Sequence, residues 1–389
     1  MQLRRLPASR SLSPSSLTSR AVAAVALAAT VVTVAGCATG TAPSAQSLAA
    51  GSGSAAPAAG TVTLVTHDSF HLPDQVLAAF TRKTGLTVKT VEFGDAGTLA
   101  TKLTLTAGSP PGDVSFGVDN TFASRTLTGG VFVPYTSPAA VNGADAYGIP
   151  GENRLTAVDY GDVCVNIDTR YFAAHDLPEP TGYSDLADPR YRGLTSLEDP
   201  DTASPGLAFL LGTIATMGDG AAGAPGYPGG WQAYWTKLKG NDVTVTSDWN
   251  TTYSTDFSGS SGKGPKPIVV SYASSPADEV VPGANGAPDT SPTKALLDTC
   301  FRQVEFAGVL RGAKNPEGAR EFIDFLLSQQ AQVAVPESMY VYPVTRGVPL
   351  PATWERFAPA PPHPATMAAS AIAAGRDGWL RTWRTLMGR

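Results

Sequence analysis

The stretch Ile268-Val269-Val270-Ser271-Tyr272-Ala273-Ser274-Ser275-Pro276 decides the fold, because it begins with apolar β-branched residues and ends in small hydroxyl residues and a proline. The apolar run predicts a buried strand. Ser275-Pro276, followed by Asp278 and Glu279, is typical of a helix N-terminus. Ligands of open α/β sheets bind where strands end in this way. A single turn of this kind is also common without a ligand, so its recurrence along the chain matters.

Strands and helices alternate after residue 60. Hydrophobic periodicity predicts strands at 61–66, 86–93 and 113–118, helices at 74–80 and 98–105, and a further helix after Asp119-Asn120-Thr121. This alternation predicts a β-α-β-α-β unit with a parallel sheet. A second α/β unit is predicted from strands at 195–200 and 243–246 and helices at 207–214 and 231–238. The aromatic residues of 231–238 have core spacing and are predicted to pack rather than to bind.

Two longer strand-like segments, Ala157–Ile167 and Leu297–Val309, are predicted to cross between the two units. The expected fold is α/β, with two lobes that are each a mostly parallel sheet flanked by helices, joined by crossing hinge strands. The expected boundaries are 61–160 with 303–345 for lobe 1, 161–302 for lobe 2, and 346–389 for a C-terminal helical segment packing near the hinge. Within these, 316–330 is predicted as one amphipathic helix and 336–344 as an aromatic loop.

The first residues have the pattern of an export signal. Arginines at positions 4, 5, 10 and 20 precede an apolar run over 21–35, which is short for a membrane span but suits a signal peptide. Val34-Ala35-Gly36-Cys37 resembles a bacterial lipobox, so we expect a signal peptide over 1–37 and a lipid on Cys37; plain secretion is the alternative. Residues 38–60 are almost wholly small or polar and predict a flexible tether.

The charge balance excludes one class of partner. The chain has 28 Lys and Arg against 33 Asp and Glu, and loss of the leader would change the formal net charge from −5 to −9. Nucleic acid is therefore not expected as a partner, because no basic stripe is available to neutralise phosphates. A cationic ligand suits this balance better.

Cys164 and Cys300 remain if Cys37 carries a lipid. Each cysteine lies in one of the two predicted crossing strands, and adjacent crossing strands would bring them within bonding distance. An oxidising compartment would favour the disulfide. Two free buried thiols are the alternative.

Motifs for catalysis are incomplete. Gly182-Tyr183-Ser184-Asp185-Leu186 approaches the nucleophile motif G-x-S-x-G but lacks its final glycine. His67 and His71 are four residues apart without the glutamate of a zinc-protease helix, and Gly259–Gly264 lacks the spacing of a phosphate loop. We therefore predict no enzyme, no metal site and no cofactor. An extracytoplasmic hydrolase is the competing class, which activity against esters or phosphates would support.

Predicted strand ends repeatedly supply small polar groups and aromatic rings. Helix N-termini beside them favour anions because their first N–H groups are unpaired, and aromatic faces favour flat or cationic rings. A ligand with a cationic aromatic body and an alcohol or phosphate tail would use both. The residues concerned are Asp68-Ser69, Asp119-Asn120, Ser204–Gly206, Trp249, Tyr272–Ser274 and Tyr340.

The ordered series of motifs resembles a known family. In chain order the motifs are Thr66-His67-Asp68-Ser69-Phe70, Gly117-Val118-Asp119-Asn120, Asp159-Tyr160-Gly161, Asp199-Pro200 with Ser204-Pro205-Gly206-Leu207, Val243–Trp249, Ser271-Tyr272 with Ser275-Pro276, and Tyr342-Pro343-Val344. Over 61–389 this series resembles the thiamine-binding receptors of bacterial ABC importers. The resemblance implies a two-lobed fold like that of periplasmic binding proteins. It also implies a monomeric extracytoplasmic receptor, anchored by its lipid, that closes on thiamine or its phosphates and delivers them to a permease and ATPase.

The resemblance also implies the binding residues. By position, Trp249, Tyr272 and Tyr340 would contact the thiamine rings, and Asp119 or Asp68 would offset the thiazolium charge or accept from the aminopyrimidine. Ser204 and Ser274, with nearby N–H groups, would hold the hydroxyl or phosphate end. The complete predicted set is His67, Asp68, Ser69, Asp119, Asn120, Ser204, Pro205, Gly206, Trp249, Tyr253, Tyr272, Ser274 and Tyr340.

Two positions depart from the family pattern. His67 stands where the family tends to have tyrosine, and Tyr340 where it tends to have tryptophan; both keep a ring. Ferric iron or another small solute is the alternative ligand within the same fold. Iron would require clustered tyrosine, histidine and carboxylate ligands, and Tyr272 is followed by Ala273 rather than by a second tyrosine.

Overall fold

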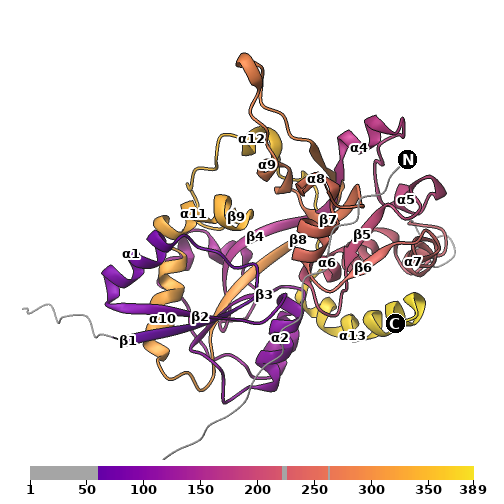
Figure 1. Ribbon diagram of the computed structural model, residues 1–389. Helices are drawn as coiled ribbons and strands as arrows, with labels where there is room; N and C mark the ends of the chain where they lie inside the picture. The colour runs from indigo at the N-terminus through magenta and orange to yellow at the C-terminus, as the bar shows by residue number, and fades with distance from the viewer. Residues whose placement is uncertain (1–59, 221–225, 262) are drawn as a thin grey trace, which may run out of the picture. The chain divides into compact units, whose positions relative to one another are not determined.

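The computed structural model describes residues 60–220, 226–261 and 263–389 (Figure 1). The predicted signal peptide, the lipobox Cys37 and nearly all of the predicted tether lie outside the described residues. Within the described part, nine strands form one mixed sheet in the order β2-β1-β3-β8-β4-β7-β5-β6, and β9 pairs with β4. The sheet is parallel toward both ends and antiparallel at its centre. No helix among these residues has the length and apolar character that crossing a bilayer requires.

One end of the sheet is built from the N-terminal elements. Strand β1 pairs in parallel with both β2 and β3, which confirms the predicted β-α-β-α-β unit. Helix α1 ends because Gly85 takes the left-handed conformation, a common helix stop. The elements are β1 (Gly60–Thr66), α1 (Asp74–Thr84), β2 (Leu86–Glu92), α2 (Ala96–Leu105), β3 (Val114–Asp119), α3 (Ala123–Thr128), η1 (Pro138–Asn142) and η2 (Ala144–Tyr147).

Two long antiparallel strands, β4 (Thr156–Asp168) and β8 (Thr293–Val309), form the centre of the sheet. Strand β8 also pairs with β3, and β4 pairs with β7, so each central strand joins one parallel end. These are the two segments that were predicted to cross between units. A disulfide joins Cys164 of β4 to Cys300 of β8. It closes a loop of 136 residues, and by the chain-entropy model such a loop constrains the unfolded chain by about 5 kcal/mol.

The other end of the sheet has the parallel order β7-β5-β6. The aromatic residues of α7 are fully buried, so they pack as predicted. The elements are α4 (Thr169–Ala174), α5 (Tyr183–Leu186), η3 (Pro189–Tyr191), β5 (Thr195–Glu198), α6 (Ser204–Met217), α7 (Gly230–Gly240), β6 (Thr244–Thr246), the π-helix η4 (Thr251–Asp256), α8 (Ser258–Ser261), β7 (Ile268–Tyr272), α9 (Ser275–Asp278) and η5 (Ala284–Gly286).

In the C-terminal third, two sequence predictions of secondary structure were wrong. The single helix expected over 316–330 is two helices, because Ser328 accepts a hydrogen bond from the amide of Ala331 and caps a new helix. The loop expected over 336–344 begins as helix, because Pro336 is accommodated inside α11 instead of ending it. The elements are α10 (Pro316–Leu326), α11 (Gln329–Met339), β9 (Tyr342–Pro343), α12 (Trp354–Phe357) and α13 (Ala369–Met387).

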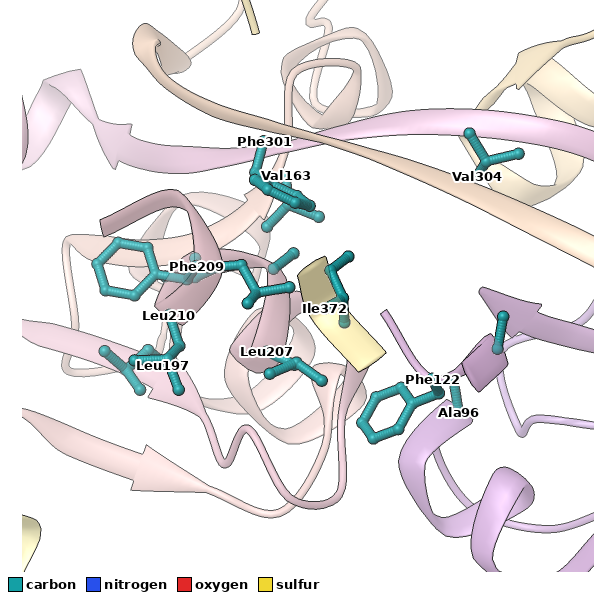
Figure 2. Close-up of a cluster of buried hydrophobic side chains, with 14 of the residues drawn as sticks. Ala96, Phe122, Val163, Leu197, Leu207, Phe209, Leu210, Phe301, Val304 and Ile372 are labelled. Carbon is teal, nitrogen blue, oxygen red and sulfur yellow. The ribbon is translucent and has the colours of Figure 1, made fainter. Parts of the chain in front are cut away.

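Helix α13 packs into the same hydrophobic core as elements from both ends of the sheet. Figure 2 shows Ile372 of α13 drawn between Leu207 of α6 and Phe122 at the start of α3. Further along α13, Trp383 makes an edge-on contact with Trp235 of α7, with ring centroids 5.8 Å apart. The C-terminal helix thus packs against both α3 and α7.

Candidate functional site

One cavity is bordered by segments from both ends of the sheet. We call it the acidic cavity. Its volume is about 200 Å³, which suits a compact small molecule. It lies where strands end and helices begin: after β1, after β6, at the last residue of β7, and at the N-termini of α2 and α6. The lining consists of His67, Ser69, Asp95, Ala96, Ser204, Pro205, Trp249, Asn250, Tyr272, Gln303, Glu305, Ser338, Met339, Tyr340 and Val341.

Two glycines make room for rings of the cavity. Gly117 of β3 has φ +97°, and a Cβ there would lie 2.0 Å from Cδ2 of His67. Gly161 of β4 faces Tyr272, whose Cδ1 would lie 2.7 Å from an added Cβ. Side chains at either position would displace the rings, so both glycines are required by close approach.

The aromatic lining residues of the cavity are Trp249, Tyr272 and Tyr340, and residues outside the cavity support Trp249. Trp249 stacks on Tyr253 with ring centroids 5.0 Å apart and an interplanar angle of 10°. Its Nε1 donates to Oγ of Ser271 at 3.0 Å, and its ring meets Tyr272 at 6.4 Å. Tyr340 takes φ +55° as the C-cap of α11, an uncommon conformation for a bulky residue that is found at functional sites. The ring of Trp249 is therefore held by stacking on Tyr253 and by the hydrogen bond to Ser271.

Asp95 connects the two helix N-termini at the cavity. It caps α2, and its Oδ1 accepts from the amides of Ala96 at 2.6 Å and Ser204 at 3.2 Å, the latter being the first residue of α6. Its Oδ2 accepts from the amide of Trp249 at 3.1 Å. Burial raises the pKa of Asp95 to about 6, although His67 and these amides oppose the shift. The carboxylate thus holds α2 against α6 and the Trp249 loop.

A second acidic group comes from the central strands. Glu305 of β8 lies opposite Asp159 of β4, and its Oε1 is 3.1 Å from Nε2 of His67. Burial and the adjacent Glu305 raise the pKa of Asp159 well above its usual range, which favours its protonated form. Burial by itself lowers the pKa of His67, but Glu305, Asp95 and Asp68 outweigh it and the net shift is upward.

More carboxyl groups surround the cavity without lining it. Burial raises the pKa of Asp119 to about 6, against the hydrogen bonds from Thr121 and Phe122 that lower it. Burial also raises the pKa of Glu198 well above its usual range. Besides burial, the charges of Glu305, Asp95, Asp119 and Glu198 raise the pKa of Tyr272, which therefore stays a neutral phenol. The environment of the cavity is strongly acidic, and its described lining contains no lysine or arginine.

Seven residues of the predicted set lie together around this cavity: His67, Ser69, Ser204, Pro205, Trp249, Tyr272 and Tyr340. The other six do not line it. Asp68 is exposed. Asn120 bridges β8 through the carbonyl of Arg302 and the amide of Val304, and Asp119 accepts from the backbone of the turn that follows it.

The remaining three predicted residues support the cavity from outside. Gly206 lets α6 pack on β5, since an added Cβ would lie 2.3 Å from the carbonyl oxygen of Glu198. Tyr253 is buried behind Trp249 and donates to Glu279 at 3.0 Å. The Ser274 hydroxyl donates to the carbonyl of Tyr340. Ser204 and Ser274, with nearby N–H groups, were predicted to hold a hydroxyl or phosphate; the amide of Ser204 donates to Asp95.

The cavity lining also contains Asp95, Gln303 and Glu305, which were not predicted from the sequence. Asp95 carried a usable signal, because it follows a predicted strand and precedes a helix, as the other strand-end residues do. The sequence signal for Glu305 was weaker: it is a carboxylate between the apolar residues Val304 and Phe306 of a predicted buried strand. Gln303 had none.

The chain belongs to the family of bacterial extracellular solute-binding proteins, whose pattern matches residues 75–362. It is therefore an extracytoplasmic receptor for a small solute and not an enzyme, and its fold is the two-lobed fold of periplasmic binding proteins. The thiamine-binding periplasmic protein of Escherichia coli (strain K12) is 29% identical over 343 residues, which are 84% of this chain and 94% of that protein. The thiamine-binding periplasmic protein of Brucella suis biovar 1 is 29% identical over 344 residues, 85% of this chain and 92% of its own.

One solved structure that is similar to this chain has the same kind of name as these relatives. The periplasmic thiamin binding protein superposes with a TM-score of 0.70 at 26% identity, covering 85% of this chain and 96% of that chain. The similarity therefore extends over both ends of the sheet and not over a single motif.

Proposed function

We propose that this protein captures thiamine in the acidic cavity and delivers it to an ABC importer. The observation that carries the proposal is the combination of Trp249, Tyr272 and Tyr340 with Asp95 and Glu305 in a lining that, among the described residues, has no lysine or arginine. Thiamine is a permanently cationic thiazolium joined to an aminopyrimidine. Aromatic faces and buried carboxylates both favour such a cation. The names of the relatives in Escherichia coli and Brucella point to the same ligand.

The parts of the cavity suggest distinct roles. The ring of Trp249, backed by Tyr253, offers a face for stacking, and Tyr272 borders it edge-on. Glu305 lies beside His67 and can neutralise the thiazolium charge or accept from the amino group. The first amide of α6 already donates to Asp95, so it is not free to bind a phosphate. The cavity therefore favours the unphosphorylated vitamin.

The finer parts of the proposal concern anchoring and closure. We propose that a lipid on Cys37 holds the receptor at the outer face of the membrane through the 38–60 tether, and that a permease and ATPase accept its ligand. We further propose that 61–160 with 303–345 and 161–302 are the lobes that close on the ligand as a monomer, with 346–389 near the hinge. Asp95, which bonds the amides of Ser204 and Trp249, would be the contact that forms on closure.

Titration calorimetry against thiamine, thiamine monophosphate, thiamine pyrophosphate and ferric citrate tests the proposal. We expect one-to-one binding of thiamine and quenching of tryptophan fluorescence, since Trp249 lies in the lining. Binding of ferric citrate without binding of any thiamine form would favour the iron alternative. Hydrolysis of esters or phosphates by the purified protein would instead favour an enzyme.

A further inference from the structure

A second cavity lies between α13, α3, the end of α2 and the loop after β5. We call it the arginine cavity. Its volume is about 680 Å³, and it shares no lining residue with the acidic cavity. Its charged lining residues are Arg125, Arg376, Arg381, Arg384, Asp201 and Asp377. A volume of several hundred Å³ is typical of small-molecule sites.

Only part of this positive charge is neutralised within the protein. Nη1 of Arg384 donates to both oxygens of Asp201, at 2.8 and 2.9 Å, so these two groups satisfy each other. Asp377 is 3.5 Å from Arg376, but its side chain is 78% exposed and gives little stabilisation. Among the described residues, the guanidinium groups of Arg125 and Arg381 have neither a hydrogen-bond nor an ion-pair partner.

Arg376 is the most informative of these residues. It is only 7% exposed, its guanidinium lies 5.4 Å from the ring centroid of Phe122, and its Nε has no hydrogen-bond partner. Burial lowers the pKa of Arg376, Asp377 raises it, and the like charge of Arg125 lowers it further. Arginine cannot shed its proton at physiological pH, so a buried guanidinium without a full set of acceptors is costly. An anion in the cavity would supply the missing acceptors.

We propose that the arginine cavity binds a small soluble oxyanion with two or more negative charges, of the pyrophosphate class. Planar guanidinium groups match the oxygens of phosphate and carboxylate in bidentate fashion. Arg125 of α3 and Arg381 of α13 provide two unpaired cations, and Arg376 provides a desolvated one at the wall. The site is independent of the acidic cavity, whose described lining is of opposite charge.

Titration calorimetry with pyrophosphate, on protein saturated with thiamine, tests the site. We expect one-to-one binding that weakens as salt is added. The Arg125→Gln and Arg381→Gln variants should each weaken it at least tenfold, because each removes an unpaired cation. Arg82→Gln, on the exposed face of α1, is the matched control and should leave it unchanged. Thiamine affinity should be the same in all three variants.

Other outcomes overturn the site. If neither pyrophosphate nor inorganic phosphate binds at low salt, the proposed site in the arginine cavity does not exist. An equal loss of pyrophosphate affinity in Arg82→Gln would indicate general charge attraction and no specific site. Binding to vesicles of phosphatidylglycerol without binding of soluble pyrophosphate would indicate a membrane contact in its place. Thermal denaturation gives a second readout, because a ligand of the folded state raises Tm; no rise in Tm with pyrophosphate would contradict the proposal.

Discussion

The acidic cavity and the arginine cavity show two ways of burying charge. The acidic cavity has a volume of about 200 Å³ and is surrounded by buried carboxyl groups, whereas the arginine cavity has about 680 Å³ and four arginines. Asp159 and Glu198 are fully buried, while Arg381 is exposed and Arg384 is paired with Asp201.

The difference follows from proton chemistry. A buried carboxyl group can lower its cost by taking up a proton, as the raised pKa of Asp159 indicates. A guanidinium keeps its charge, so arginines must remain near solvent or meet an anion. Several acids can therefore crowd around one small cavity, and a cationic ligand gains an electrostatic advantage there from the acids that lose their proton when it binds.

The largest expected effect tests the aromatic lining residues of the acidic cavity. Trp249→Ala should weaken thiamine binding about 100-fold, or about 2.7 kcal/mol, because it removes a stacking face and exposes Tyr253. Trp249→Phe should recover part of this loss. Calorimetry measures both, with Trp379→Ala on α13 as the control outside both described cavity linings. Unchanged affinity in Trp249→Ala would exclude Trp249 from the site.

The next effect tests the acidic character of the cavity. Glu305→Gln should weaken thiamine binding about tenfold, or about 1.4 kcal/mol, because the isosteric amide cannot offset the thiazolium charge. The same substitution at Glu317, an exposed residue of α10, should have no effect. If the two variants bind thiamine equally well, charge on Glu305 makes no contribution.

Phosphorylated ligands sharpen the contrast between the cavities. Thiamine pyrophosphate should bind up to about tenfold more weakly than thiamine, because its phosphates meet Asp95 and Glu305 without a lysine or arginine in the described lining. Repeating the measurement in Arg381→Gln determines whether the arginine cavity contributes to binding of the phosphates. Tighter binding of thiamine pyrophosphate than of thiamine in that variant would contradict an acidic site.

The smallest effect concerns pH. Because the pKa values of Asp95 and Asp119 are raised to about 6, lowering the pH from about 7.5 to about 5.5 should protonate most of both groups and raise the Kd for thiamine roughly fourfold. Because the pKa of the lining residue His67 is also raised, the trend measured by calorimetry is compared with that of Asp95→Asn and Asp119→Asn, and an unchanged trend in both variants would show that these charges are irrelevant.

The stability of the ligand-free protein should change in the opposite direction. A carboxyl group whose pKa is higher in the folded than in the unfolded state binds protons more tightly when folded. The contribution of Asp95 and Asp119 to the free energy of unfolding should therefore increase as the pH falls from about 7 toward 4. Thermal denaturation of variants Asp95→Asn and Asp119→Asn, compared with the unaltered protein, isolates this contribution from other titrating groups.

Much of the site was predictable because its residues are local strand ends. Tyr272 is the last residue of β7, Trp249 lies in the turn that follows β6, and Ser204-Pro205 begins a helix. Parallel strands bring such ends to one edge of a sheet, so the topology alone gathers them. Asp119 and Asn120 have the same local signal. However, Asp119 accepts hydrogen bonds within the turn that follows it, and Asn120 bonds the backbone of β8. Strand-end chemistry therefore identifies candidates without separating ligand contacts from structural bonds.

By itself, the sequence determined the alternation of strands and helices, the two central crossing strands and the aromatic strand ends, because periodicity and turn chemistry depend on neighbours within a few residues. Only the tertiary structure decided that Asp95 meets Ser204 and Trp249, that Asp159 faces Glu305, and that α13 brings arginines to α3. These partners are far apart in the chain. The burial and electrostatic environment of each charged group exist only once the segments pack together.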